Sequence, residues 1–289
     1  MTDLAGICVP VCTPFSNGGA RLDEVALLGH LDAMLAAGVH IIALCGGTGE
    51  FPFLSEAEKR RVIELGCGHI DGRAKVVAQT SAIRTEDSIE ASKHAEGAGA
   101  DCLLVLPPYF EGPDADGVLW HYERVAASVS CEVMAYNIPQ YSDFDVTPEL
   151  FARIRNASGN VTCIKDSTGD MLRLELLVAT GARVFNGSDY LNLYGLVAGC
   201  AGCFSGSGNA IPAQLVELYD LVMAGKLEAA TALWGRLRPA SVFFCTHAFN
   251  PAIKAATEMA GRPLGECRLP VQPLAPAERA ALAEIMAAI

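Results

Sequence analysis

Two residues able to do covalent and acid–base chemistry each stand at the end of an apolar run. Val161–Ile164 leads into Lys165, and Val133–Ala135 leads into Tyr136. Desolvation disfavours the ammonium form of a lysine, so an amine in apolar surroundings is more often neutral and nucleophilic. Beside a tyrosine that can move protons, such an amine could form a Schiff base with a ketone. The alternative is a structural lysine that pairs with the adjacent Asp166.

A glycine-rich turn follows another apolar run, with the sequence Gly-Gly-Thr-Gly-Glu at residues 46–50. Glycines allow backbone amides to converge on an anion without side chains in the way, so this turn predicts an anion site. A phosphate is the competing ligand, although no lysine follows the turn as it does in a P-loop. We expect Glu50 to cap or anchor the turn.

The elements that would position these residues alternate along the chain. Eight short apolar runs are continuous rather than alternating in hydrophobicity, as in parallel strands covered on both faces. Helix-like segments with a 3.6-residue period separate them, and this pattern predicts a (β/α)8 barrel. The active site should then lie at the carboxyl ends of the strands. The runs are Ile7–Val11, Ile41–Leu44, Val76–Ala78, Leu103–Leu106, Val133–Ala135, Val161–Ile164, Val184–Phe185 and Cys203–Phe204.

Helix starts carry recognisable signals. The sequence SEAE at residues 55–58 reads as a capping box, TEDS at residues 85–88 opens in the same manner, and Pro148 suits a first helical position. Four helices are expected after the last strand, at Pro212–Ala224, Lys226–Arg238, Pro251–Met259 and Pro276–Ala288. The first would complete a barrel of residues 1–225, and the others would form an extension of residues 226–289 packed on it.

Composition excludes several functions. The chain has 289 residues and a formal charge of -12, which argues against nucleic acid or an anionic membrane as a partner. No apolar stretch approaches the roughly 20 residues of a membrane-spanning helix. Eleven cysteines lie mostly in apolar runs, and an odd number fits free thiols in a reducing cytoplasm. Cys200 and Cys203 form a CxxC pair, but no second pair or histidine pair accompanies them as metal ligands.

Three motifs in this order resemble the dihydrodipicolinate synthase / N-acetylneuraminate lyase family of pyruvate-type class I aldolases. They are Gly-Gly-Thr-Gly-Glu at residues 46–50, Tyr-Asn-Ile-Pro at 136–139 and Ile-Lys-Asp-Ser-Thr-Gly-Asp at 164–170. The resemblance implies that Lys165 forms the Schiff base and that Tyr136 is the general acid and base. It also implies that Thr48, with the amides of Gly47 and Thr48, holds the carboxylate of a 2-oxo acid. A homotetramer, as a dimer of dimers, is implied as well.

Departures from the family pattern bear on the substrate. Gly47 replaces a second hydroxyl residue of the synthases, Phe110 replaces their relay tyrosine, and Tyr141 replaces the arginine that binds the second substrate. Tyr109 is a possible substitute for the lost relay tyrosine. These losses point away from condensation with aspartate semialdehyde, because a phenyl ring cannot pass a proton and tyrosine cannot supply a bidentate charge.

The loop after the seventh run partly resembles that of the sialic-acid lyases. Gly187 and Asp189 match positions that bind sugar hydroxyls there, and Ser207 lies near the expected serine position, which is Gly206 here. We therefore expect these residues to contact a polyhydroxylated substrate, although Tyr190 replaces the acidic residue that comes next in the lyases.

The favoured interpretation is a cytoplasmic lyase that cleaves a 2-keto-3-deoxy sugar acid, or another 4-hydroxy-2-oxo acid, into pyruvate and an aldehyde. The lysine imine serves as the electron sink, so neither a metal nor an organic cofactor is required. A dehydratase using the same imine is the first alternative. Dihydrodipicolinate synthesis and a catalytically inactive ligand-binding barrel are the weaker ones.

Overall fold

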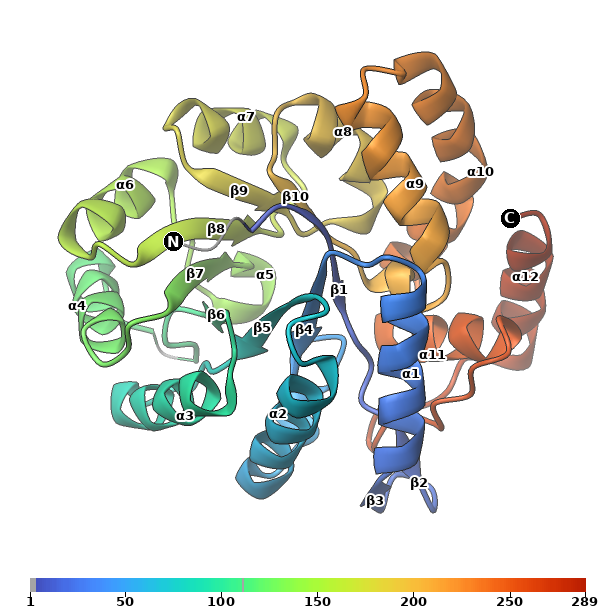
Figure 1. Cartoon of the computed structure of the whole chain (residues 1–289), viewed down its shortest axis with the longest axis horizontal. Helices are drawn as coiled ribbons and strands as arrows, with labels where there is room; N and C mark the ends of the chain where they lie inside the picture. Colours follow the sequence, from blue (N-terminus) through green and yellow to red (C-terminus); the bar gives the residue numbers. More distant parts are fainter. Residues whose placement is uncertain (1–3, 111) are drawn as a thin grey trace.

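Eight parallel strands form a closed barrel at the centre of the molecule (Figure 1). The computed structural model describes residues 4–110 and 112–289. The strands follow the order β1-β10-β9-β8-β7-β6-β5-β4 around the barrel, and all eight apolar runs are confirmed as its strands. Their bounds are β1 Gly6–Pro10, β4 Ile41–Leu44, β5 Lys75–Gln79, β6 Cys102–Val105, β7 Glu132–Asn137, β8 Val161–Asp166, β9 Arg183–Asn186 and β10 Gly202–Phe204; β2 Phe15–Ser16 and β3 Arg21–Leu22 form a separate antiparallel pair.

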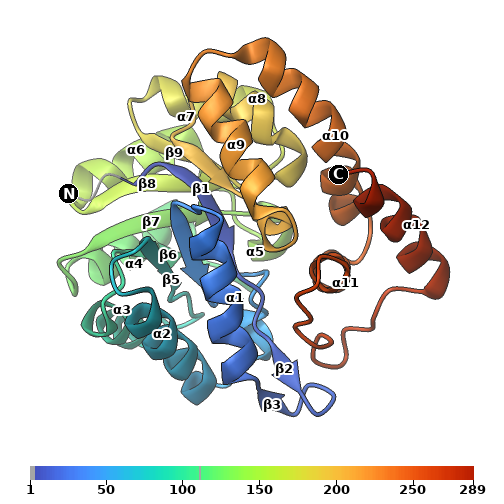
Figure 2. The ribbon, with the colours of Figure 1, turned by 45° about the vertical axis from the view of Figure 1, so that its right-hand side comes forward.

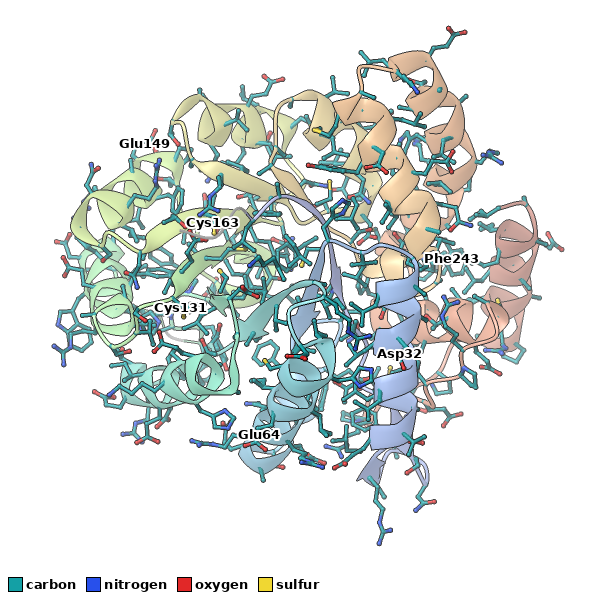
Figure 3. The ribbon with its side chains drawn as sticks, viewed as in Figure 1. Asp32, Glu64, Cys131, Glu149, Cys163 and Phe243 are labelled. Atoms are coloured by element: carbon teal, nitrogen blue, oxygen red, sulfur yellow. The ribbon has the colours of Figure 1, made fainter. Side chains whose placement is uncertain are left out.

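Side chains alternate along the strands between the barrel interior and the layer under the helices. The interior is one apolar cluster that includes Met134, Tyr136 and Cys163. Cys163, labelled in Figure 3, lies on β8 two residues before Lys165. By the period of two, Lys165 shares the inward face with Cys163, as Tyr136 shares it with Met134.

Helices cover the outside of the barrel in chain order. Their apolar faces pack on the strands, and charged residues such as Glu64 and Glu149 lie on their outward faces (Figure 3). Both faces of each strand are therefore buried, which explains the continuous apolar runs. The bounds are α1 Glu24–Ala36, α2 Glu56–Ile70, α3 Thr85–Ala98, α4 Ala115–Ala126, α5 Pro139–Ser142, α6 Pro148–Ala157, α7 Met171–Ala179, α8 Asn192–Val197 and α9 Pro212–Met223.

Two of the expected helix starts agree with the structure and one does not. Ser55 and Glu58 form the capping box at α2, and Pro148 occupies the first position of α6. The cap predicted at Thr85 is wrong, because α3 has Arg84 at its N-cap with no side-chain hydrogen bond. The Thr85 hydroxyl instead lies 2.9 Å from Nδ1 of the buried His121, so a tertiary contact replaces the local one.

The C-terminal helices α10 Leu227–Thr246, α11 Phe249–Met259 and α12 Pro276–Ala287 lie together on one side of the barrel (Figure 2). α10 does not end at Arg238 as predicted but continues through Pro239. Buried Phe243 and Phe244 lie beyond the proline, and their packing offsets the lost backbone hydrogen bond. The division into residues 1–225 and 226–289 stays a prediction, and it falls in the turn between α9 and α10.

In the part of the chain that the structure describes, no helix is both long and apolar enough to cross a membrane. All eleven cysteines are free thiols. Burial raises the pKa of Cys200 to about 12, so this member of the CxxC pair is a poor source of thiolate. Among the described residues, no group of three or more histidine, cysteine or acidic side chains could hold a metal ion.

Candidate active site

Lys165 and Tyr136 lie opposite each other on neighbouring strands at the carboxyl end of the barrel. They are register partners of the β7–β8 pair, and both are buried, with exposed fractions of 6% and 5%. The lysine Nζ is 3.9 Å from the centroid of the Tyr136 ring and 4.8 Å from that of Phe204 on β10. The amine therefore lies over two aromatic rings that belong to the apolar interior cluster of the barrel.

The structural alternative for Lys165, an ion pair with Asp166, is wrong. Asp166 is the next residue on the strand, so its side chain points to the other face. Its carboxylate accepts hydrogen bonds from Asn137 Nδ2 and from the backbone and hydroxyl of Thr168. Within residues 4–110 and 112–289, the Lys165 amine has neither a carboxylate partner nor a hydrogen-bond acceptor.

A polar network behind the two residues fixes the ends of β7 and β8. Asn137 donates to Asp166 at 2.9 Å and to Asp145 at 3.0 Å, and its carbonyl oxygen Oδ1 accepts from the amide of Val146. Arg173 completes the network through two contacts with the Asp145 carboxylate. Burial raises the pKa of Asp166, although hydrogen bonds from Thr168 and Asn137 oppose this shift. The network holds the strands that carry the amine and the phenol in register.

The glycine-rich turn follows β4 and opens toward the barrel mouth. Cys45 and Glu50, at its two ends, both adopt left-handed backbone conformations, with φ values of 55° and 59°. Gly47 is exposed and Thr48 is buried. Within the described ranges, the amides of Gly47 and Thr48 donate no hydrogen bond to a protein acceptor, so both are available to an anion.

Gly187 lies against the stem of Lys165 rather than facing open space. A Cβ atom at this position would be 2.9 Å from Lys165 Cε and 2.0 Å from Ser167 Oγ. The predicted role of Gly187 in contacting substrate stays a prediction. The packing explains why a glycine stands at this position, because any larger side chain would collide with the side chain of Lys165, which extends into the barrel.

Replacing Gly187 by alanine should therefore displace Lys165. We expect kcat/KM to fall by about 10- to 100-fold, because small misplacements of a reacting group are costly. Gly235→Ala is the matched control, since a Cβ there meets nothing within 4 Å and Gly235 lies in the exposed part of α10. Steady-state kinetics of the two variants check the prediction, and unchanged kinetics of Gly187→Ala would contradict it.

Asp189 contacts the loop after β10, and Ser207 is part of that loop. The Asp189 carboxylate accepts hydrogen bonds from the Ser205 hydroxyl and from the amides of Gly206 and Ser207 at 2.7 to 3.1 Å. The hydroxyls of Ser205 and Ser207 are 2.8 Å apart. Both predicted residues are thus buried in a network that shapes this loop, and direct contact of either with substrate stays a prediction.

Tyr109 and Phe110 point in different directions after β6. Tyr109 packs against the barrel-interior cluster, whereas Phe110 has a φ of 60° and is 78% exposed. Burial, and to a smaller degree Glu56, raises the pKa of Tyr109. Tyr141, where the synthases are expected to carry arginine, is 81% exposed on α5.

Three residues near the site were missed in the sequence. Phe204 supplies the second aromatic face toward Lys165, and Asn250 and Lys254 of α11 contact the glycine-rich turn. Phe204 looked like any apolar strand residue. Lys254 carried a usable signal, since it is a lone cation in the stretch Pro-Ala-Ile-Lys-Ala-Ala.

A buried amine beside a tyrosine, at the carboxyl end of a (β/α)8 barrel, is the arrangement of a class I aldolase. The whole chain agrees with this class, because residues 3–289 match the sequence profile of the dihydrodipicolinate synthetase family. The chain belongs to this family. Its members are lyases and synthases with a class I Schiff-base mechanism, and the chain is an enzyme of this kind.

Relatives of known name are similar over nearly their full length. The 4-hydroxy-tetrahydrodipicolinate synthase of Syntrophobacter fumaroxidans is 36% identical over 281 residues, covering 95% of this chain and 94% of that protein. The enzyme of the same name from Acidiphilium cryptum is 35% identical, covering 97% of each chain.

Solved structures share the fold closely. A putative dihydrodipicolinate synthetase from Pseudomonas aeruginosa is 33% identical with a TM-score of 0.95, and 99% of each chain is covered. A prophage protein of the dihydrodipicolinic acid synthase family from E. coli K12, solved in complex with pyruvate, is 28% identical with a TM-score of 0.93. The match covers 98% of this chain and 97% of that protein.

Proposed function

We propose that this enzyme cleaves a 4-hydroxy-2-oxo acid, most simply a 2-keto-3-deoxy sugar acid, into pyruvate and an aldehyde. The observation that carries the proposal is the Lys165 amine, held over the Tyr136 ring at 3.9 Å with no carboxylate beside it. An amine so placed is shielded from water, and no carboxylate of the described residues competes for its nitrogen. It is suited to attack a ketone carbon.

In the proposed reaction, the substrate carboxylate rests on the amides of Gly47 and Thr48. The Lys165 nitrogen attacks the C2 ketone. Tyr136 gives its phenol proton to the carbinolamine hydroxyl, which leaves as water, so that a protonated imine and a phenolate remain. Tyr136 then takes the proton of the C4 hydroxyl, and the electrons of the C3–C4 bond move toward the imine nitrogen. The aldehyde departs, the remaining enamine is protonated at C3, and water releases pyruvate from the lysine.

The mouth of the barrel supports a substrate other than aspartate semialdehyde. Phe110 offers no phenol for a proton relay, and Tyr141 offers no guanidinium for a second carboxylate. Near Gly206, an added Cβ would be 2.7 Å from the ring of Phe249 and 3.5 Å from Thr48 Oγ1. An apolar ring therefore occupies the space where a sialic-acid lyase is expected to carry a serine. This favours a substrate whose aldehyde half is smaller than the aldehyde half of a sialic acid.

Condensation of pyruvate with aspartate semialdehyde is the second candidate, because the relatives reported above carry the name 4-hydroxy-tetrahydrodipicolinate synthase. A dehydratase is the third, since the same imine acidifies C3 and can expel the C4 hydroxyl. The three reactions share Lys165 and Tyr136, so the residues near the amine do not separate them.

Products separate the three candidates. Purified enzyme would be incubated with a panel of 2-keto-3-deoxy sugar acids, and separately with pyruvate and aspartate semialdehyde, and the products identified by mass spectrometry. We expect pyruvate and an aldehyde in equal amounts from at least one keto-deoxy acid. A dioxo acid would instead indicate the dehydratase. A kcat/KM for aspartate semialdehyde that exceeds the value for every keto-deoxy sugar acid would indicate the synthase.

We further propose that the enzyme is a homotetramer. We also propose that it works in a reducing cytoplasm, because its eleven cysteines are free thiols. Light scattering of the purified protein would measure the oligomeric state.

A further inference from the structure

The second buried lysine of the molecule has no place in the proposed chemistry. Lys254 on α11 is 4% exposed, and its Nζ lies 2.7 Å from Oε1 of Glu50, whose side chain has no exposed surface. Glu50 is the last residue of the glycine-rich turn. A charge pair buried to this extent is costly to form, so its location on the turn that faces the substrate carboxylate calls for an explanation.

The same helix holds the turn at a second point. Asn250 lies one helical turn before Lys254, and its Nδ2 donates to the backbone carbonyl of Gly47 at 3.0 Å. Residues four apart lie on one helix face, so α11 presents both groups to the turn at once. The two contacts reach opposite ends of the segment whose amides are proposed to bind the carboxylate.

Further contacts extend this attachment to the chain after α11. The amide of Arg268 donates to the other carboxylate oxygen of Glu50 at 3.0 Å, and Lys254 donates to the carbonyl of Glu266 at 3.1 Å. The C-terminal extension thus contacts both carboxylate oxygens of Glu50, Oε1 through the ion pair with Lys254 and Oε2 through a hydrogen bond from the Arg268 amide. Within the described part of the chain, no other acidic side chain lies within ion-pair distance of Lys254.

The backbone of the turn explains why such an attachment is needed. Cys45 and Glu50 both have positive φ values, which L-residues other than glycine adopt only when their surroundings enforce them. Between them lie three glycines, which restrict the backbone least. The backbone hydrogen bonds of the turn itself run from the amides of Glu50 and Phe51 to the carbonyls of Gly47 and Gly46. They leave the amides of Gly47 and Thr48 unpaired, so contacts from outside the turn help to fix the direction of these two amides.

We propose that Lys254, acting through Glu50, is a positioning residue that aims the Gly47 and Thr48 amides at the carboxylate of the 2-oxo acid. Asn250 is the second point of the same clamp. The inference rests on the proposed function, because it requires a substrate carboxylate on those amides. It assigns to the C-terminal extension a part in substrate binding, beyond covering the barrel.

The test compares two charge pairs in one protein. Glu50→Gln and Lys254→Met break the clamp. Glu132→Gln instead breaks a second ion pair, in which Oε1 of the buried Glu132 lies 2.6 Å from Nη2 of Arg183. These two residues stand at the amino ends of β7 and β9. That pair lies at the face of the barrel opposite the site, so Glu132→Gln is a matched control. For each variant, the unfolding temperature, kcat, KM for the 2-oxo acid and the pyruvate concentration for half-maximal borohydride trapping are measured.

We expect Glu50→Gln and Lys254→Met to raise KM and the half-saturating pyruvate concentration by about 10- to 100-fold, with kcat changed by less than about threefold. The double variant should show little more than either single change, because both break one interaction. Glu132→Gln should lower the unfolding temperature without changing either binding measure. Asn250→Ala, at a partly exposed position, should raise KM by about three- to tenfold and remains informative if the buried variants do not fold.

Unchanged half-saturation in folded Glu50→Gln, Lys254→Met or Asn250→Ala would overturn the inference, as would an equal rise in Glu132→Gln. Failure of the proposed function is separable from this result. If pyruvate is not trapped on the wild-type enzyme, the proposed chemistry fails. If it is trapped but the variants bind it normally, only the clamp fails.

Discussion

Replacing Lys165 by alanine is expected to lower kcat/KM for pyruvate release by about 10⁴-fold or more, as for the loss of a covalent nucleophile. Without the amine no imine forms, and the C3–C4 bond has no electron sink. The unfolding temperature should change little or rise, because the amine lies on two aromatic rings without a carboxylate partner. Coupled pyruvate assays and thermal unfolding of the same preparations measure both effects.

Lys165→Arg is the matched control for the charge. A guanidinium keeps the cation at the end of β8 but cannot form an imine under these conditions. We expect it to be as inactive as the alanine variant. Activity of Lys165→Arg within tenfold of the wild type would show that a positive charge, and not a covalent bond, is what the reaction requires.

Replacing Tyr136 by phenylalanine should lower kcat by about 10²- to 10⁴-fold, the usual range for a general acid or base. The ring remains, so the packing against Lys165 at 3.9 Å is kept and only the hydroxyl is lost. Imine formation with pyruvate should slow but not stop, because the amine is untouched. Stopped-flow or quench measurements of imine formation, next to steady-state kcat, separate the two steps.

Tyr122→Phe is the control for the loss of a buried hydroxyl. Tyr122 on α4 is buried as well, in the apolar layer between the helices and the strands, and its hydroxyl donates to the carbonyl of Val105 at 2.8 Å. Its loss should cost about 1 kcal/mol of stability and leave kcat unchanged. If Tyr136→Phe behaves like Tyr122→Phe, the phenol of Tyr136 is not the proton carrier. Tyr109, which packs toward the barrel interior, is then the next candidate.

The fold could be predicted because strands and helices of a barrel leave local signals. Continuous apolar runs identified all eight strands. Because active sites of (β/α)8 barrels lie at the carboxyl ends of the strands, the sequence already predicted that Lys165 and Tyr136 lie close together. Helix ends were less certain, since tertiary packing overrode local preference. α10 passes through Pro239, and Thr85 binds His121 instead of capping α3.

The surroundings of the site could not be predicted in the same way. Phe204, Asn250 and Lys254 come close to the site only because β10 closes the barrel and α11 folds back over the glycine-rich turn. Nothing in their local sequence fixes that long-range geometry. Asp189 and Ser207 were selected from a resemblance, which gave their positions but not their hydrogen bonds to each other and to Ser205.

The central claim is that one particular amine of this chain forms a carbon–nitrogen double bond with a 2-oxo acid. Borohydride reduction in the presence of pyruvate, followed by peptide mass spectrometry, tests it most directly. Lys254 is an internal reference, because it is equally buried but held by Glu50. We predict one reduced pyruvate on the peptide that contains Lys165 and none on the peptide that contains Lys254. A protein without the adduct, or with the adduct on another lysine, would contradict the account.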